Sequence, residues 1–249
     1  MKVEAHILAW NESDIIGLVI KHYQKFCDHI TIWDNYSDDS TQLIAESMGC
    51  DVKKFGIKGQ LDDQAYLDVK NHAWKGSDSD WCIVCDCDEV LYFPTIKMDN
   101  VIHDVVYDTK ALLLQACREQ KTIIKTKGWN IYSESMPQND LLEITTGYRF
   151  DNYSKSVIFN PKEIKSINYK PGAHICEPVG NVVYSEESLY LLHYKNIGGV
   201  ERLLRRNAEY RKRLSYNNKK MGYGIHYLDS EAKVRKEWNE RIAKSVPLI

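Results

Sequence analysis

Three acidic residues stand within four positions between two apolar runs. The stretch WCIVCDCDEVLYF, residues 81–93, places Asp86, Asp88 and Glu89 at the end of a predicted core strand. Carboxylates are stable in water or beside a cation, and they are costly in an apolar core. If the chain bends here, Asp86 and Asp88 can face one hard divalent cation, Mg²⁺ or Mn²⁺. Taken alone, the Asp-x-Asp pattern fits a metal site and a solvated turn equally well.

The segments before these acids alternate between strand and helix patterns. Apolar runs predict strands at 3–10, 29–34, 50–55 and 81–86. Helices are expected between them: one capped by Asn11, one capped by Ser37, and one over 62–76. This β-α-β-α-β-α-β order predicts an α/β fold with a largely parallel, helix-covered sheet and right-handed crossovers.

Polar side chains follow three of these strands. Asn11 and Glu12 come after the first strand, Asp34 and Asn35 end the second, and the acids of residues 86–89 end the fourth. Ligands of such sheets bind beyond the carboxyl ends of the strands. We therefore expect a polar, cation-binding site at this edge, which explains why acids stand at the tip of a core strand.

The second half of the chain is less regular. Strands are expected at 111–118, 154–161 and 188–194, with a turn around 137–139. From Gly199 the chain is basic and has a helical pattern. No Pro- or Ser-rich linker and no internal repeat divides it, so we expect one domain with a helical C-terminal extension.

Composition excludes several classes of protein. The 249 residues carry a net charge of −2, so no basic field indicates a nucleic-acid partner. No apolar run approaches the roughly twenty residues that span a bilayer. The seven cysteines are odd in number and no signal peptide opens the chain, which favours reduced thiols in the cytoplasm. Cys82 and Cys85 lack a second pair at zinc-site spacing, so buried thiols are the better interpretation.

Several motifs together resemble one enzyme family. AWNE (9–12), DNYSDDST (34–41), VKNHAW (69–74) and CDCDEVLYF (85–93) occur in the order found in nucleotide-sugar glycosyltransferases of the GT-A fold. The resemblance is to the family-2-like branch, which is related to family 92. GWNIYS, KSVIFNP, GAHICEP and LLHYKNIGGVERLLRRN extend it to about residue 210.

The resemblance implies a Rossmann-like GT-A domain over 1–198. Its nucleotide-binding half would cover about 1–93 and its acceptor half about 94–198, with residues 199–249 packed on it as a basic helical extension. The implied reaction is metal-dependent and inverting. It moves a sugar from a nucleotide donor, UDP-linked, to a hydroxyl of a glycan or lipid-linked acceptor, in surface polysaccharide assembly.

The resemblance also implies roles at matching positions. Asp34 would contact the nucleotide base, and Asp88 would hold Mn²⁺ or Mg²⁺ against the donor diphosphate. Asp86 would share that metal or touch the ribose, and Glu89 would orient the loop. The remaining implied contacts are Ala9, Trp10 and Glu12 in the base and ribose pocket, Lys70 and Asn71 near the nucleotide, and His193, with His174 as the weaker candidate, at the metal or phosphate.

An inverting transferase needs a base that takes the proton of the acceptor hydroxyl. In related enzymes a carboxylate some tens of residues after Asp-x-Asp does this. The candidates here are Glu134, Asp140 and Glu143, and the sequence does not rank them. Each of them can equally be a turn or surface acid.

Some features stay open at this stage. Phe159 replaces an arginine of the family pattern, so phosphate or acceptor contacts can differ. The basic helix at 200–220 is either a solvated face or a contact with an anionic membrane or lipid acceptor. Two rival functions are a non-catalytic nucleotide- or carbohydrate-binding module and a nucleotidyltransferase, although the latter would need a Gly-rich phosphate loop that AWNESD lacks.

Overall fold

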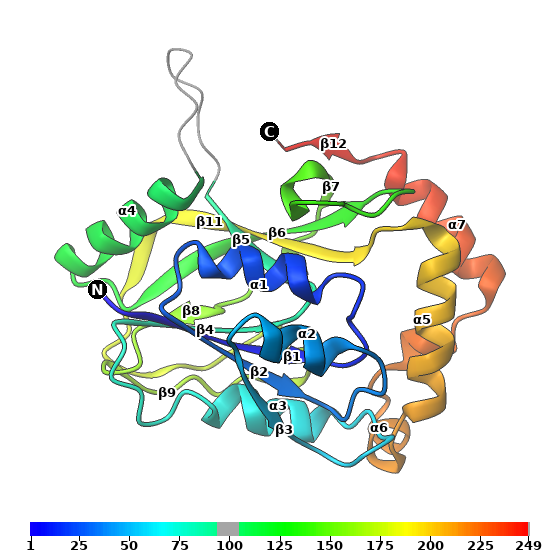
Figure 1. The fold of residues 1–249 in the computed structure, drawn as a ribbon, viewed down its shortest axis with the longest axis horizontal. Helices are drawn as coiled ribbons and strands as arrows, with labels where there is room; N and C mark the ends of the chain where they lie inside the picture. The colour runs from blue at the N-terminus through cyan, green and yellow to red at the C-terminus, as the bar shows by residue number, and fades with distance from the viewer. Residues whose placement is uncertain (94–104, 249) are drawn as a thin grey trace.

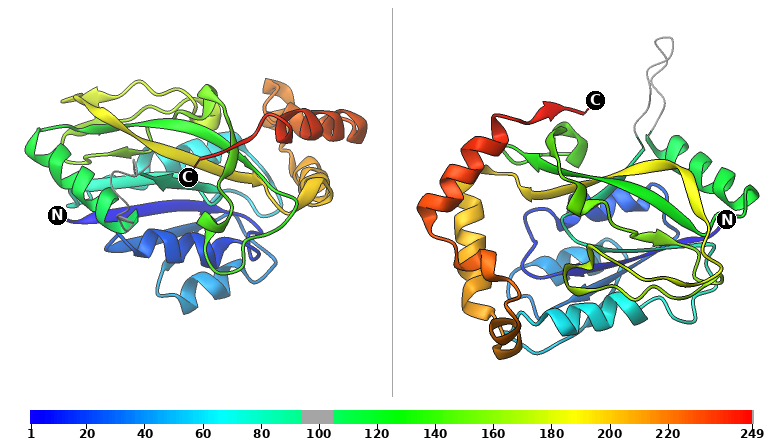
Figure 2. Two further views of the ribbon diagram at one scale, coloured as in Figure 1. Left: turned by 90° about the horizontal axis from the view of Figure 1, so that it is seen from above. Right: turned by 180° about the vertical axis from the view of Figure 1, so that it is seen from behind.

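A single large sheet forms the centre of the protein, and helices cover both of its faces (Figure 1, Figure 2). The computed structural model describes residues 1–93 and 105–248. The strand order is β12-β7-β6-β8-β4-β1-β2-β3, and β11 pairs with both β6 and β5. The predicted α/β fold class is confirmed.

The N-terminal half is the parallel part of this sheet. Strands β3, β2, β1 and β4 lie side by side in parallel register, and β1 is buried along its whole length. The elements are β1 (Val3–Ala9), α1 (Ile16–Gln24), β2 (His29–Asp34), α2 (Thr41–Ser47), β3 (Asp51–Lys54), α3 (Asp63–His72) and β4 (Trp81–Asp86). All four predicted strands and the third predicted helix are confirmed.

Side chains along β1 and β4 alternate between the two faces of the sheet, which explains why helices cover both faces. Ala5 and Ile7 pack in one core with α1, whereas Leu8 packs in a second core with Leu67 and Trp74. Successive strand side chains point to opposite faces, so a strand buried on both sides needs a helix layer on each. Helices α1 and α3 therefore lie on opposite faces of the sheet.

The second half adds antiparallel pairs and one long parallel pair, β6 with β11. Its strands are β5 (Glu89–Tyr92), β6 (Ile123–Tyr132), β7 (Thr146–Arg149), β8 (Ile158–Phe159), β11 (Tyr184–Asn196) and β12 (Val246–Pro247), with β9 (Ile164–Ser166) and β10 (Val179–Gly180) forming a separate pair. Its helical elements are α4 (Val105–Arg118), η1 (Leu141–Glu143), η2 (Asp151–Tyr153) and η3 (Pro171–Ala173).

The C-terminal segment is helical, as predicted, and it follows β11 directly. It contains α5 (Gly199–Arg213), α6 (Tyr216–Met221), η4 (Ile225–Leu228) and α7 (Glu231–Ile242). Helix α5 stands across one end of the sheet, beyond the loops that follow β1 and β4 (Figure 1). At its end, the backbone N–H of Leu61 donates to the carbonyl of Arg213 at 2.7 Å, which ties α5 to the segment before α3.

Three local predictions were wrong. Residues 111–118 form part of helix α4, in which Leu112, Leu113 and Ala116 are buried at helical spacing. Asn11 is not an N-cap: it has φ 50° and bridges to the β2–α2 loop, and α1 begins at Ile16. Helix α2 begins after Ser40, not after Ser37.

Two further sequence expectations concern cysteines and membranes. All seven cysteines are free thiols. Within the described ranges, none of the helices combines the length and the hydropathy that a bilayer crossing requires.

Candidate active site

A cavity of about 210 Å³ opens beyond the carboxyl ends of β1 and β4. The loops after these two strands form its floor. Helix α3, strand β11 and the segment from Tyr153 to His174 contribute side walls, and α5 and η4 close the remaining side. The polar edge that the sequence predicts is therefore a cavity, and the C-terminal segment is one of its walls.

The acidic loop after β4 is fixed by buried lysines. Lys70 of α3 donates to Asp86 Oδ2 at 2.7 Å, and Lys155 forms a buried ion pair with Glu89. Glu89 also accepts the backbone N–H of Asp86 at 3.1 Å, so it holds the turn that presents Asp86 and Asp88. Burial opposes ionisation of Asp86, but Lys70 and Lys155 keep its pKa below the usual value.

Asp88 faces a histidine of β11, the strand that pairs with β5. Its Oδ2 lies 3.4 Å from His193 Nε2, and His193 Nδ1 lies 2.9 Å from Asn130 Oδ1. A carboxamide oxygen only accepts hydrogen bonds, so His193 Nδ1 donates to Asn130 Oδ1, and this contact turns Nε2 toward the carboxylate of Asp88. A carboxylate oxygen and an imidazole nitrogen are both donor types that divalent metals accept. The pair therefore fits a divalent metal, with Asn130 orienting the imidazole.

Asp86 is not a third member of that pair. Among residues 1–93 and 105–248, the only group of three carboxylate, imidazole and thiol ligands within 4.8 Å of one another is Glu4, His6 and Cys82. In that group Trp33 Nε1 donates to His6 Nδ1 at 3.3 Å, so His6 Nε2 carries a proton toward Glu4. Cys82 thus belongs to a buried hydrogen-bonded cluster, in agreement with the interpretation that it is a buried thiol.

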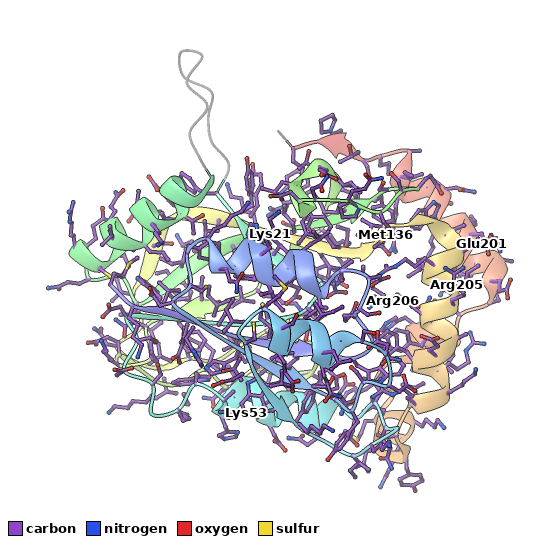
Figure 3. All side chains as sticks on the ribbon, viewed as in Figure 1. Lys21, Lys53, Met136, Glu201, Arg205 and Arg206 are labelled. Carbon is purple, nitrogen blue, oxygen red and sulfur yellow. The ribbon has the colours of Figure 1, made fainter. Side chains whose placement is uncertain are left out.

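Helix α5 brings an arginine to the loop after β1. The guanidinium of Arg206 makes a two-pronged ion pair with the buried carboxylate of Glu12, with one N–O distance of 2.6 Å. Arg206 lies on the sheet side of α5, whereas Glu201 and Arg205 lie on its outer side (Figure 3). Burial raises the pKa of Glu12 to about 7, and Arg206 opposes that rise. This pair locks α5 against the cavity floor.

Aromatic rings line the rest of the cavity. Tyr153 stacks on His193 at 4.3 Å between ring centroids, and His174 meets the same tyrosine edge-on at 5.1 Å. On the α5 side, Tyr210 packs against both Trp10 and Tyr227. Such flat, half-buried rings are suited to stacking on a base or a sugar.

Lys195 is a cation of this cavity without a carboxylate partner among the described residues. Its Nζ lies 3.4 Å from His226 Nε2 and 4.8 Å from the centre of the Tyr227 ring. Burial lowers the pKa of its ammonium group to about 8, although Asp88 opposes this. This half-buried ammonium group near the Asp88–His193 pair is available for an anionic ligand.

Most of the predicted nucleotide and metal contacts meet at the cavity, but two of them, Asp34 and Asn71, do not line it. Asp34 is fully buried and accepts the backbone N–H of Ser37, at 3.0 Å and 3.2 Å from its two oxygens. Asn71 hydrogen-bonds the backbone of Tyr169, so it fixes the turn before His174. Both lie beside the cavity lining rather than in it. The predicted residues that do line the cavity are Ala9, Trp10, Glu12, Lys70, Asp86, Asp88, His174 and His193.

The structure does not bring the three candidate bases to the cavity. Asp140 and Glu143 form a reciprocal capping box around η1, and Asp140 also pairs with Lys25 of α1 at 2.8 Å. Glu134 accepts from Trp238 Nε1 at 3.1 Å. Each carboxylate is used in a structural contact elsewhere.

The cavity also contains residues that the sequence analysis did not select. These are Lys155, Lys195, Arg206, Tyr210 and Tyr227. A signal for two of them existed, because Lys155 opens the KSVIFNP motif and Lys195 follows His193 in LLHYKN. Arg206 was one arginine among many in a basic helix, and only its contact with Glu12 distinguishes it.

The fold and the cavity together define a mixed α/β protein with an ion-paired ligand site at the carboxyl edge of its parallel strands. A protein of Rickettsia bellii (strain RML369-C), described as an uncharacterized glycosyltransferase, is 32% identical to this chain over 90 residues. The matched stretch covers 36% of this chain and 29% of that relative, so it spans less than a third of the relative's length. The resemblance to glycosyltransferases is confirmed by this similarity. No family model matches the chain.

Two solved structures are similar to the chain at low sequence identity. TarS from S. aureus, residues 1–349, is 12% identical over 84% of this chain and 65% of its own, with a TM-score of 0.47. Glucosyl-3-phosphoglycerate synthase from Mycobacterium tuberculosis, in complex with Mn²⁺, UDP and glucosyl-3-phosphoglycerate, is 17% identical over 51% of this chain and 44% of its own, with a TM-score of 0.34.

Proposed function

We propose that this protein is a metal-dependent glycosyltransferase that uses a nucleotide-sugar donor, with UDP as the nucleotide. The observation that carries the proposal is the pairing of Asp88 with His193 beside the cationic groups of Lys195 and Arg206, in one cavity at the carboxyl edge of the sheet. A diphosphate needs both a metal and fixed positive charge. The similarity to the Rickettsia bellii glycosyltransferase supports the same class of reaction.

Asp88 and His193 are the residues that would hold Mn²⁺ or Mg²⁺. Their donor atoms are an oxygen and an imidazole nitrogen, a set that both the geometry and the chemistry of these ions accept. When bound, the ion neutralises the diphosphate and stabilises it as a leaving group. Asp86, held by Lys70, is left to accept hydrogen bonds from the ribose.

The chain's own cations complete the phosphate site. Lys195 supplies a half-buried ammonium group, and the guanidinium of Arg206 lines the cavity while it pairs with Glu12. Charges that are partly withdrawn from solvent act more strongly on a diphosphate than they would in bulk water. The aromatic wall of Trp10 and Tyr210 offers the base a flat apolar surface.

The acceptor is a hydroxyl of a glycan or a lipid-linked sugar, attacked in one inverting displacement during surface polysaccharide assembly in the cytoplasm. A surface near the cavity supports contact with a lipid-linked acceptor or an anionic membrane. In α6 and η4, which adjoin Gly224 and Tyr227 of the cavity wall, four apolar side chains are exposed beside Lys219 and Lys220. They are Tyr216, Met221, Ile225 and Leu228.

A thermal-shift and calorimetric titration with UDP, GDP, CDP, dTDP and ADP tests the proposal. We expect UDP to raise the melting temperature in Mn²⁺ and not in EDTA, because a ligand that binds only the folded state stabilises it. Asp88→Asn should lose this shift. Asp78→Asn is the matched control, since Asp78 is exposed and pairs with Lys2 away from the cavity. If folded wild-type protein binds none of these nucleotides, the proposal is wrong.

A further inference from the structure

Every carboxylate that lines the cavity is already engaged. Glu12 is held by Arg206, Asp86 by Lys70, and Asp88 faces His193. The fourth, Asp63, accepts from Asn218 Nδ2 at 2.7 Å. Since Glu134, Asp140 and Glu143 lie outside the cavity, none of the carboxylates that line it is free to take a proton from an acceptor.

The imidazole of His174 lines the cavity and has one ring nitrogen without a hydrogen-bond partner among the described residues. Its Nδ1 lies 2.7 Å from the backbone carbonyl of Asn152, which can only accept, so Nδ1 carries the proton. The neutral ring then has its lone pair on Nε2. Within residues 1–93 and 105–248, nothing hydrogen-bonds to that nitrogen. This is the arrangement of a general base: one ring nitrogen fixed by a backbone acceptor and the other presented to the site.

The turn before His174 is shaped around its ring. Gly172 has φ +75°, and a Cβ at this position would lie 2.7 Å from His174 Cδ2 and 2.9 Å from its Nε2. Ala173 is also left-handed, with φ 54°, a conformation that costs energy for a residue with a side chain. A bulkier residue at 172 would displace the imidazole, so the local sequence keeps open the space beside Nε2.

The position of His174 also suits a displacement at the donor sugar. His174 and His193 both contact the ring of Tyr153, His193 on its face and His174 at its edge. The candidate metal residue and the open imidazole thus border the same aromatic ring. A donor bound beside this ring would have its leaving phosphate toward His193 and the acceptor hydroxyl toward His174.

We propose that His174 is the catalytic base of the transferase, in place of the carboxylate that the family resemblance implies; this inference rests on the proposed function. In the step, the acceptor oxygen forms a bond to the anomeric carbon of the donor as the bond from that carbon to the phosphate oxygen breaks. The bonding pair leaves with the diphosphate. The hydroxyl proton moves to His174 Nε2.

The surroundings of His174 keep it neutral at pH 7. Burial lowers the pKa of the imidazole, and Lys155 and Lys70 lower it further, whereas Glu89 opposes them. His226 of η4 faces it from the other wall, and His174 lowers the pKa of His226 in turn. The base form therefore dominates at neutral pH, and turnover should fall on the acid side as His174 becomes protonated.

The test compares His174→Gln and His174→Ala with wild type, in full-length protein. The readouts are UDP–Mn²⁺ affinity by calorimetry and UDP release from UDP-glucose, UDP-galactose and UDP-N-acetylglucosamine, with water or added sugars as acceptor. We expect UDP–Mn²⁺ affinity within about twofold of wild type and turnover lowered at least about 100-fold. The acid limb of the pH profile of turnover should be lost, and added imidazole should partly restore the turnover of His174→Ala. His29→Gln, at the opposite end of β2, is the control and should behave as wild type.

Gly172→Ala gives a second variant that keeps the histidine. It should lower turnover in the same way, with donor affinity retained, because it moves the ring and leaves the metal pair in place. Unchanged turnover in His174→Gln, or a loss of UDP affinity equal to the loss of turnover, overturns the proposal. Wild-type protein that binds UDP but releases none from any donor also overturns it, whereas wild-type protein that binds no nucleotide overturns the proposed function itself.

Discussion

Arg206 shows how one buried ion pair can hold a helix against a site. The side chains of Arg206 and Glu12 are 11% and 5% exposed, so neither charge has water as an alternative partner. We predict that Arg206→Ala lowers the free energy of unfolding by about 3–5 kcal/mol, because the carboxylate of Glu12 is left buried and unpaired. Urea denaturation at pH 7.5 measures this. The double variant Glu12→Gln/Arg206→Ala should recover much of the loss, and a strictly additive double variant would contradict the coupling.

His22 gives the fold a specific acid sensitivity. Its Nε2 donates to the carbonyl of Leu91 at 2.8 Å, and its buried Nδ1 has no partner among residues 1–93 and 105–248. Burial lowers the pKa of the ring to about 4. The folded state holds the neutral ring, so the stability from His22 is complete above the unfolded pKa of 6.5. That stability is lost as the pH falls from 6.5 to 4.

We expect His22 to account for about 2–3 kcal/mol of destabilisation between pH 8 and pH 4.5. Urea unfolding of wild type and His22→Gln at both values measures it, since glutamine keeps a donor for Leu91 but does not titrate in this range. The variant should lose less stability on acidification than wild type. Equal losses in the two proteins would show that other groups carry the acid sensitivity.

At the residue scale, the sequence predicted those site residues that stand at the ends of regular strands. Asp86 is the last residue of β4, Asp88 lies just after it, and His193 lies in an apolar run that is visible as a strand. The candidate bases Glu134, Asp140 and Glu143 lie outside the cavity, because an acid's distance from Asp-x-Asp along the chain does not determine where it lies in space. Arg206 was not predictable because its role depends on a contact with Glu12, 194 residues away.

At the scale of elements, Gly128 of β6 lets η2 approach the sheet. A Cβ at this position would lie 2.6 Å from Cβ of Tyr153, and the backbone of Gly128 bonds Phe150 and Ser154. We predict that Gly128→Ala costs about 1–3 kcal/mol and displaces Tyr153, because two backbones would have to separate. The melting temperature and the affinity for UDP–Mn²⁺ should both be lowered.

Gly17 of α1 is the matched control for that substitution. A Cβ there meets Ile44 Cγ2 at an ordinary 3.5 Å, and alanine favours a helix over glycine by up to about 1 kcal/mol. Gly17→Ala should therefore be neutral or stabilising, with unchanged nucleotide affinity. A Gly128→Ala variant as stable as Gly17→Ala would mean that η2 can shift without cost.

The same scale explains which elements the sequence could predict. The four parallel strands are short apolar runs separated by helical segments, and buried parallel strands have that appearance. Residues 111–118 were predicted as a strand because a compact apolar run does not distinguish a strand from a buried helix. Strand β8 has only two residues, Ile158 and Phe159, and its pairing with Cys82 and Ile123 across the sheet cannot be read from local pattern.

At the scale of the whole molecule, the C-terminal segment has two separable parts. The part from α5 to η4 supplies the cavity wall, and α7 anchors that wall to the sheet. Trp238 of α7 is 2% exposed, meets Tyr132 of β6 edge-on at 5.4 Å, and donates to Glu134. The segment that the sequence suggested as an appendage to the domain therefore completes the site.

This division predicts opposite effects for two aromatic substitutions. Trp238→Ala should lower the free energy of unfolding by about 3–5 kcal/mol, since it removes a large buried side chain, yet leave UDP–Mn²⁺ affinity unchanged at 15 °C, where the protein is folded. Tyr227→Ala removes a half-buried ring of the cavity wall. It should therefore weaken UDP–Mn²⁺ binding clearly and change the free energy of unfolding less. Urea denaturation and calorimetry on both variants distinguish the two roles. If Trp238→Ala weakens binding in fully folded protein as much as Tyr227→Ala does, then α7 and the cavity wall form one cooperative unit, and the division between anchor and wall is wrong.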